Sequence, residues 1–174
     1  MTRMVWLGLA VVAFGSGGCV TETVSSTLGS SPRREVRYVA PAPASAPIND
    51  LAVLKGMRPF DTTGDGFPNQ INVSVYLFAR PYAVPRFVEG ALIFTLTPPR
   101  EVEPIAEWTF DSAALAASRI RNVIGEGYTV KLDLSKAGVS HVPSGSGDLK
   151  VVFVPTDGGN SVESSGVQAV RFEQ

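Results

Sequence analysis

Short segments of alternating apolar and polar residues, separated by glycine and proline, constrain this chain more than any other feature. In Ile71–Phe78 every second residue from Ile71 to Leu77 is apolar, and Tyr128–Leu134 has the same period. A period of two is typical of a β-strand with one buried face. Gly 17 and Pro 13 together exceed one residue in six, which favours short strands and turns over long helices.

Five further segments complete the predicted strands: Leu51–Leu54, Ala91–Leu96, Ile105–Phe110, Leu149–Val154 and Gly166–Phe172. One segment has a helical period instead. Asp111 is suited to cap it, apolar residues from Ala113 to Ile124 recur at three and four positions, and Gly125 is suited to end it. The pattern predicts a mainly β domain, an antiparallel β-sandwich (Ig-like or C2-like) of about seven strands with one short crossover helix.

The first 19 residues have the layout of an export signal. Arg3 precedes an apolar run of 11 residues, Met4–Phe14, and the small residues Gly15–Gly18 lead to Cys19. The run is shorter than the roughly 20 residues that a membrane-spanning helix needs. The segment resembles a bacterial lipoprotein signal that ends at its cysteine, with Ser16 where such signals usually have leucine. The alternative is an ordinary signal peptide with an incidental cysteine.

This resemblance implies that residues 1–18 are a cleaved signal peptide and that the Cys19 thiol carries diacylglycerol. Acyl chains hold a protein durably at a bilayer because each buried CH₂ contributes about 0.8 kcal/mol. Val20, which follows the cysteine, implies export to the outer membrane. Cys19 is also the only cysteine of the chain, so no disulfide can form within it.

A change in composition separates this signal from the domain. Residues 19–48 are rich in Ser, Pro and Ala, which predicts a lipid-anchored, disordered tether. The run Ala40–Pro47 is expected to be extended and polyproline-like. Residues 49–174 contain all the predicted strands and form the single β-sandwich domain.

The loop before the first long strand contains the best candidate site. Its sequence resembles the Asp-rich calcium loops of thrombospondin type 3 repeats, dockerins and EF-hands. The resemblance implies five oxygen ligands around Gly66: Asp61, Thr63, Asp65, the Phe67 carbonyl and Asn69. Two carboxylates are few for a cation that takes about six to eight oxygen ligands. The alternative is a turn that Asp and Gly stabilise without metal.

Aromatic residues suggest a second, weaker candidate. Tyr76, Phe78, Tyr82 and Phe87 are predicted to form an exposed binding patch that Trp108 joins. The alternative is that they fill a second core face under the helix.

The order of these motifs is similar to that of an uncharacterised family of secreted bacterial lipoproteins with an Asp/Gly-rich loop. The resemblance covers about residues 51–172. It rests on the loop at Gly64–Gly66, the Trp108–Phe110 strand and the Gly127–Tyr128 strand, and it implies no activity.

The sequence therefore predicts a cell-envelope lipoprotein that displays a β-sandwich binding or structural module. Its partners are the membrane, through the lipid on Cys19, and an envelope protein or glycan. The alternative function is a calcium-dependent glycan- or protein-binding module that uses the Asp61–Asn69 loop. Lys+Arg 15 against Asp+Glu 16 argues against a nucleic-acid partner.

No catalysis is expected from the sequence. His141, the single histidine, lies between predicted strands without a recognisable nucleophile motif, and Glu101, Glu103 and Glu107 are expected on one solvated strand face. A hydrolase needs a nucleophile with an adjacent base, or two carboxylates that face each other across a cleft.

Overall fold

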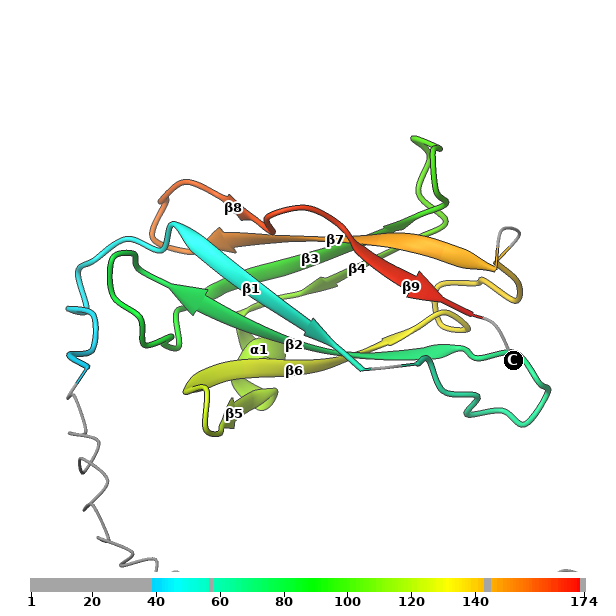
Figure 1. Ribbon diagram of the computed structural model, residues 1–174, viewed down its shortest axis with the longest axis horizontal. Helices are drawn as coiled ribbons and strands as arrows, with labels where there is room; N and C mark the ends of the chain where they lie inside the picture. The colour runs from blue at the N-terminus through cyan, green and yellow to red at the C-terminus, as the bar shows by residue number, and fades with distance from the viewer. Residues whose placement is uncertain (1–38, 57, 143–144, 173–174) are drawn as a thin grey trace, which may run out of the picture. The chain divides into compact units, whose positions relative to one another are not determined.

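The seven segments with strand patterns all form strands, and these pair into two antiparallel sheets (Figure 1). The computed structural model describes residues 39–56, 58–142 and 145–172. One sheet has four strands in the order β1-β2-β6-β5; the other has five, β4-β3-β7-β8 with β9 also paired to β7. The elements are β1 (Asp50–Lys55), β2 (Gln70–Phe78), β3 (Gly90–Thr97), β4 (Ala106–Phe110), α1 (Ser112–Ala117), β5 (Arg119–Arg121), β6 (Glu126–Asp133), β7 (Ser146–Pro155), β8 (Val162–Glu163) and β9 (Gln168–Arg171).

The core lies between the two sheets. Every second residue of β2 from Ile71 is buried, and so is every second residue of β6 from Tyr128, as the alternation predicts. The five-stranded sheet adds large side chains such as Phe94 and Phe153, both with no exposed surface. The two sheets and their connections thus form a β-sandwich around one apolar layer.

The helix is shorter than predicted. Asp111 does cap it, because its side chain accepts a hydrogen bond from the Ala114 amide, but α1 ends at Ala117. The next residues form β5, which pairs with β6, and Gly125 closes the hairpin between these strands with a φ of 131°. Only Leu115 of α1 is buried, so a longer Ala-rich helix would bury little additional apolar surface. Pairing with β6 instead gives the N–H and C=O groups of Arg119–Arg121 hydrogen-bond partners. The short strands β5 and β8 were not predicted.

Part of the predicted tether packs on the domain. The Ala46 amide donates to the Pro43 carbonyl at 3.0 Å and closes a turn, so Ala40–Pro47 is not polyproline-like throughout. The guanidinium of Arg86 donates to the carbonyls of Ala44 and Ala46, and Ile48 packs against the core. These contacts fix the segment through which the chain enters β1.

Residues 1–38, which include the predicted signal and Cys19, lie outside the described residues. Within the part of the chain that the structure describes, no helix combines the length and the apolar character that crossing a membrane requires.

Candidate functional site

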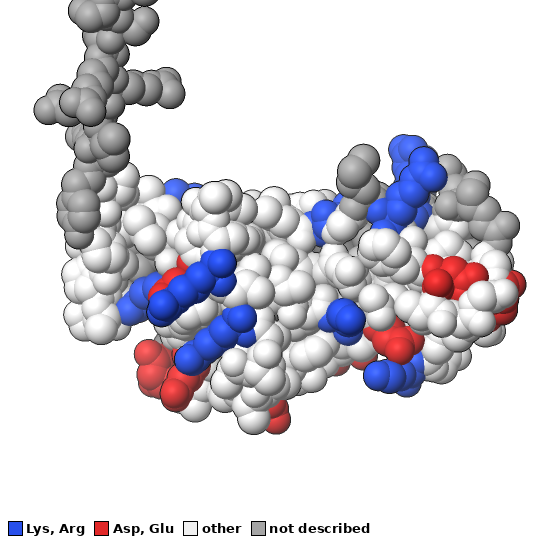
Figure 2. Space-filling view, turned by 90° about the horizontal axis from the view of Figure 1, so that it is seen from below, with Lys and Arg blue, Asp and Glu red and all other residues white. Residues whose placement is uncertain are grey.

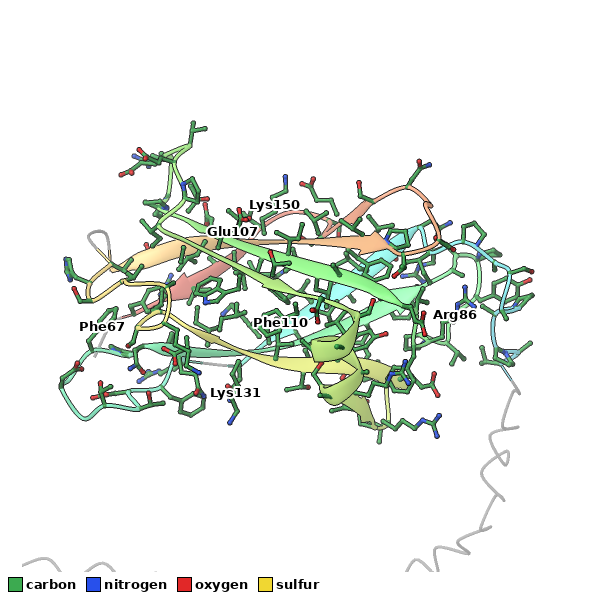
Figure 3. All side chains as sticks on the ribbon, turned by 180° about the vertical axis from the view of Figure 1, so that it is seen from behind. Phe67, Arg86, Glu107, Phe110, Lys131 and Lys150 are labelled. Atoms are coloured by element: carbon green, nitrogen blue, oxygen red, sulfur yellow. The ribbon has the colours of Figure 1, made fainter. Side chains whose placement is uncertain are left out.

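The loop Asp61–Asn69 lies at the end of the sandwich opposite to Arg86, as the labels of Phe67 and Arg86 in Figure 3 show. It connects the segment after β1 to β2. Phe67 anchors it from within, because its ring stacks on that of Phe172 with centroids 6.3 Å apart. Phe60 bridges to Gln70 and closes the base of the loop. The loop is therefore closed at its base by the Phe60–Gln70 bridge and held to the domain by the ring of Phe67.

The carboxylate of Asp61 organises the tip of this loop. Its Oδ1 accepts hydrogen bonds from the Thr63 amide, the Thr63 hydroxyl and the Gly64 amide, and its Oδ2 accepts one from the Gly66 amide. The Gly64 and Gly66 backbone donors hold the pKa of Asp61 below its ordinary value, because they favour the charged form. Gly64 and Gly66 both have positive φ angles, which glycine adopts at little cost. The Asp61 carboxylate thus holds the turn together, and glycine suits the positive φ angles at positions 64 and 66.

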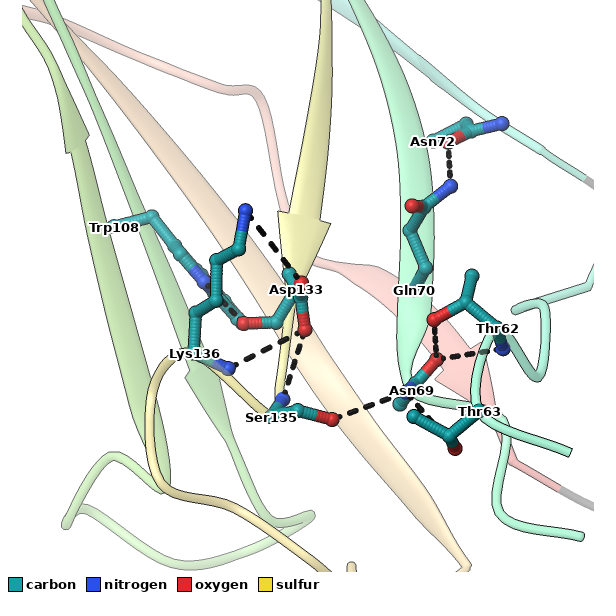
Figure 4. A network of polar contacts seen from close by, with 9 residues as sticks. All are labelled: Thr62, Thr63, Asn69, Gln70, Asn72, Trp108, Asp133, Ser135 and Lys136. Carbon is teal, nitrogen blue, oxygen red and sulfur yellow. Dashed lines mark hydrogen bonds and ion pairs between the residues drawn. The ribbon is translucent and has the colours of Figure 1, made fainter. Parts of the chain in front are cut away.

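Asn69 ties the loop to the neighbouring connection after β6 (Figure 4). Its side chain is 1% exposed. Its Oδ1 accepts from both the amide and the hydroxyl of Thr62, at 3.0 and 2.8 Å, and its Nδ2 donates to the Ser135 hydroxyl at 3.0 Å. A buried polar group costs free energy unless it is paired, and Asn69 is paired at both ends of its amide. Its position is therefore explained by its role in closing the loop.

The five predicted calcium ligands do lie in one loop, but the side-chain oxygens of Asp61, Asp65 and Asn69 already accept hydrogen bonds. Asp65 Oδ1 accepts from the Phe67 amide at 2.8 Å, and the oxygens of Asp61 and Asn69 accept the bonds given above. Among the described residues, no three His, Cys, Asp or Glu side chains gather in a group that could hold a metal ion. Calcium binding by this loop stays the alternative to a turn that forms without metal.

Removal of calcium is expected to leave the melting temperature unchanged, because the loop's own amides already bind both oxygens of Asp61 and one oxygen of Asp65. The measurement compares thermal melts in Ca²⁺, in EDTA, and in Mg²⁺ as a control for ionic strength. A melting temperature that falls in EDTA and returns with Ca²⁺, but not with Mg²⁺, would establish the calcium-dependent alternative instead.

A second candidate site lies along the side of the sandwich where β4 and β6 run without a strand between them. We call it the β4–β6 cleft. Its volume is about 320 Å³, and seven residues line it: Gln70, Trp108, Thr109, Phe110, Lys131, Asp133 and Lys136. Pockets of this size are typical of small-molecule sites.

The strand pairing explains why the cleft is open. β4 is the end strand of its sheet. β5 covers β6 only over Glu126–Tyr128, so the rest of β6 has a strand partner on one side only. Trp108 bridges the gap: its indole Nε1 donates to the Asp133 carbonyl at 3.1 Å, as Figure 4 shows. This bond holds the indole in a fixed position at the cleft.

The cleft contains both apolar and hydrogen-bonding groups. Trp108 and Phe110 are half-buried, and the Phe110 ring packs edge-on against Phe94 at 5.6 Å. Lys131 extends from the outer face of the four-stranded sheet, as Figure 3 shows. Cationic and anionic side chains are interspersed over this face of the molecule (Figure 2), so any charge preference of the cleft arises locally.

The sequence identified only Trp108 among these residues. The alternation in Tyr128–Leu134 did predict that Lys131 and Asp133 point outward, and they do. It carried no signal that β4, a strand of the other sheet, would bring Trp108 to the same edge.

The predicted aromatic patch needs correction. Tyr76 is 2% exposed and Phe78 is 8% exposed, so these two side chains are not available as a binding surface. Tyr76 accepts a hydrogen bond from the Asn122 side chain at 2.7 Å, and the guanidinium of Arg80 lies over the Phe78 ring at 4.9 Å. The β2–β3 connection and the β5–β6 hairpin thus cover the outer face of β2 at this end.

The other two residues of that patch are half-buried. The Phe87 ring packs edge-on against Tyr128 at 5.7 Å, and the guanidinium of Arg119 lies over it at 4.9 Å. The Tyr128 hydroxyl donates to the Val88 carbonyl and accepts from the Val88 amide. Burial raises the pKa of Tyr128, because a buried phenolate lacks solvation. Phe87 therefore packs against the core beside β5 and β6.

The residues considered for catalysis lie apart. His141 is exposed in the connection between β6 and β7. Glu107 is in β4, whereas Glu101 and Glu103 lie in the preceding loop rather than on a strand face as predicted. The three glutamates are all exposed.

Comparisons with known proteins add no assignment: neither the family models nor the curated proteins searched contain a match to this chain.

Proposed function

We propose that this protein is a cell-envelope lipoprotein, anchored by acyl chains on Cys19, that displays its β-sandwich as a non-catalytic binding module. The observation that carries the proposal is the order of Arg3, an 11-residue apolar run, four small residues and the only cysteine of the chain. Such a run is too short to span a bilayer and suits a cleaved export signal.

The structure of the domain is compatible with display from a tether. The strap of residues 44–48 is held by Arg86 and by the packing of Ile48, so the chain enters β1 at a defined end of the sandwich. The Asp61–Asn69 loop lies at the opposite end (Figure 3). A domain tethered in this way stays at a high local concentration near the membrane.

A binding role is favoured over a hydrolase by the chemistry of the cleft. The β4–β6 cleft offers an indole, a phenyl ring and several hydrogen-bonding side chains, which suit recognition. Its lining includes one carboxylate, Asp133, whereas a glycosidase uses two.

Intact mass of the protein from the membrane fraction tests the anchor. We expect the mass of residues 19–174 plus acyl chains, and we expect Cys19→Ser to lose both the acyl mass and the membrane association. Ser16→Leu, which restores the usual residue of such signals, is the matched control and should be acylated like the wild type. An unmodified Cys19, or a Cys19→Ser variant that stays in the membrane fraction, would overturn the proposal.

A further inference from the structure

We propose that the β4–β6 cleft binds a saccharide that carries a carboxylate. This inference rests on the binding role proposed above and names the ligand class. Three features of the cleft carry it: a fixed indole, an array of both donors and acceptors, and a local surplus of positive charge.

The indole of Trp108 provides the platform. Its Nε1 is already bonded to the Asp133 carbonyl, so the ring is held in place before a ligand arrives. A preorganised group loses little entropy when it binds. The polarised C–H bonds of a sugar ring pack well on the electron-rich face of an indole, and Phe110 extends the apolar surface beside it.

The polar side chains around this platform include acceptors as well as donors. Gln70 donates its Nε2 to Asn72, which leaves its carbonyl oxygen on the cleft as an acceptor. Thr109 contributes a hydroxyl that both donates and accepts. Asp133 Oδ1 accepts from the Ser135 and Lys136 amides, and its Oδ2 faces Lys136. Sugar hydroxyl groups need both kinds of partner.

Two lysines, Lys131 and Lys136, and one carboxylate, that of Asp133, line the cleft. The Lys136 Nζ is 3.9 Å from Asp133 Oδ2, and its side chain is 84% exposed. Among the ion pairs of the described residues, none includes Lys131. The ammonium group of Lys131 is therefore available to pair with an anionic group of a ligand, and a carboxylate on the saccharide meets this requirement.

An extended acidic peptide fits the cleft less well. A peptide would bind most readily by adding a strand to the free edge of β4. That edge has only five residues, and the second of them is the exposed Glu107. A short edge strand with a charged side chain disfavours strand addition, and Glu107 would repel an acidic peptide.

Tryptophan fluorescence gives a direct test, because Trp6 and Trp108 are the only tryptophans of the chain. The protein is expressed with Trp6→Phe, so that any molecule that keeps residues 1–18 has no second tryptophan, and is purified in detergent. It is titrated with trigalacturonate, with maltotriose as a neutral saccharide of the same length, and with pentaglutamate as an acidic peptide. We expect saturable change in Trp108 emission with trigalacturonate and binding of maltotriose that is at least about tenfold weaker, because the charged contact is lost.

Lys131→Gln is the decisive variant, and Lys150→Gln is its matched control. Both remove one positive charge, but Lys150 lies on the outer face of the other sheet (Figure 3) and pairs with Glu163. We expect Lys131→Gln to weaken trigalacturonate binding about fivefold and Lys150→Gln to leave it unchanged.

Three outcomes would overturn the inference: no response to trigalacturonate, equal weakening by both lysine variants, or binding of pentaglutamate in preference to the saccharide. If the intact mass shows acylation but trigalacturonate causes no change in fluorescence, the saccharide inference fails and the proposed lipoprotein display is unaffected. Saccharide binding by a protein without acyl chains would leave the cleft assignment standing and remove the anchor.

Discussion

Replacing Asn69 with alanine is expected to lower the free energy of unfolding by about 2–3 kcal/mol. The substitution removes the acceptor for the Thr62 amide and hydroxyl and the donor to Ser135. Because the site is almost fully buried, water cannot replace these partners without opening the loop. The loss comes mainly from polar groups left unpaired rather than from the small change in apolar area.

Urea denaturation of the two proteins measures this difference. Asn72→Ala is the matched control, since it removes the same side chain three residues further along, where Asn72 is half-buried and accepts one bond from Gln70. We expect the control to cost less than about 1 kcal/mol. Equal losses in the two variants would show that Asn69 does not hold the loop to the β6–β7 connection.

The sequence predicted the sandwich because the alternation of buried residues is local information. Ile71 and Val73 are on the buried face of β2 and Tyr128 and Val130 on that of β6, as a period of two requires. The helix was overestimated for a related reason. A spacing of three and four between Ala113 and Ile124 is helical as a pattern, but it does not show that Arg119–Arg121 has a strand to pair with.

The site residues could be predicted only in part, because their roles depend on contacts between distant segments. The Asp61–Asn69 segment was recognised as a loop from its Asp and Gly residues, but Asn69 bonds to Ser135, 66 residues away. Trp108 and Lys131 line the same cleft because β4 is the end strand of its sheet and β5 leaves this part of β6 uncovered in the other sheet. Nothing in the spacing of either residue indicates this.

Tyr76 is a residue that the sequence pattern predicts to be exposed but that contacts with a neighbouring strand bury. It is on the outer face of β2, and alternation alone predicts that such a side chain is exposed. Its ring lies instead across Gly127, where a Cβ atom would approach the ring carbons Cδ1 and Cε1 to 2.7 and 2.8 Å. An aromatic ring that covers a glycine on a neighbouring strand is a known device for stabilising a sheet, and it accounts for the burial of Tyr76.

This packing makes Gly127→Ala the second substitution with a large expected effect, about 3 kcal/mol of lost stability. The added Cβ would meet the Tyr76 ring and, at 2.8 Å, the carbonyl oxygen of Val75. Tyr76 cannot swing away freely, because it is 2% exposed and its hydroxyl is bonded to Asn122. The backbone oxygen of Val75 can move only if the β2–β6 ladder shifts.

The control is Gly56→Ala, because the nearest atom to its added Cβ would be the Asn72 carbonyl oxygen at 3.6 Å, an ordinary contact. We expect this variant to change stability by less than about 1 kcal/mol. If the Tyr76 ring is the main obstacle, Tyr76→Ala combined with Gly127→Ala should cost at least about 1 kcal/mol less than the sum of the two single losses. Strictly additive losses would show that the added Cβ clashes with the Val75 carbonyl oxygen and not with the Tyr76 ring. A Gly127→Ala variant as stable as the control would contradict the close packing of β2 on β6.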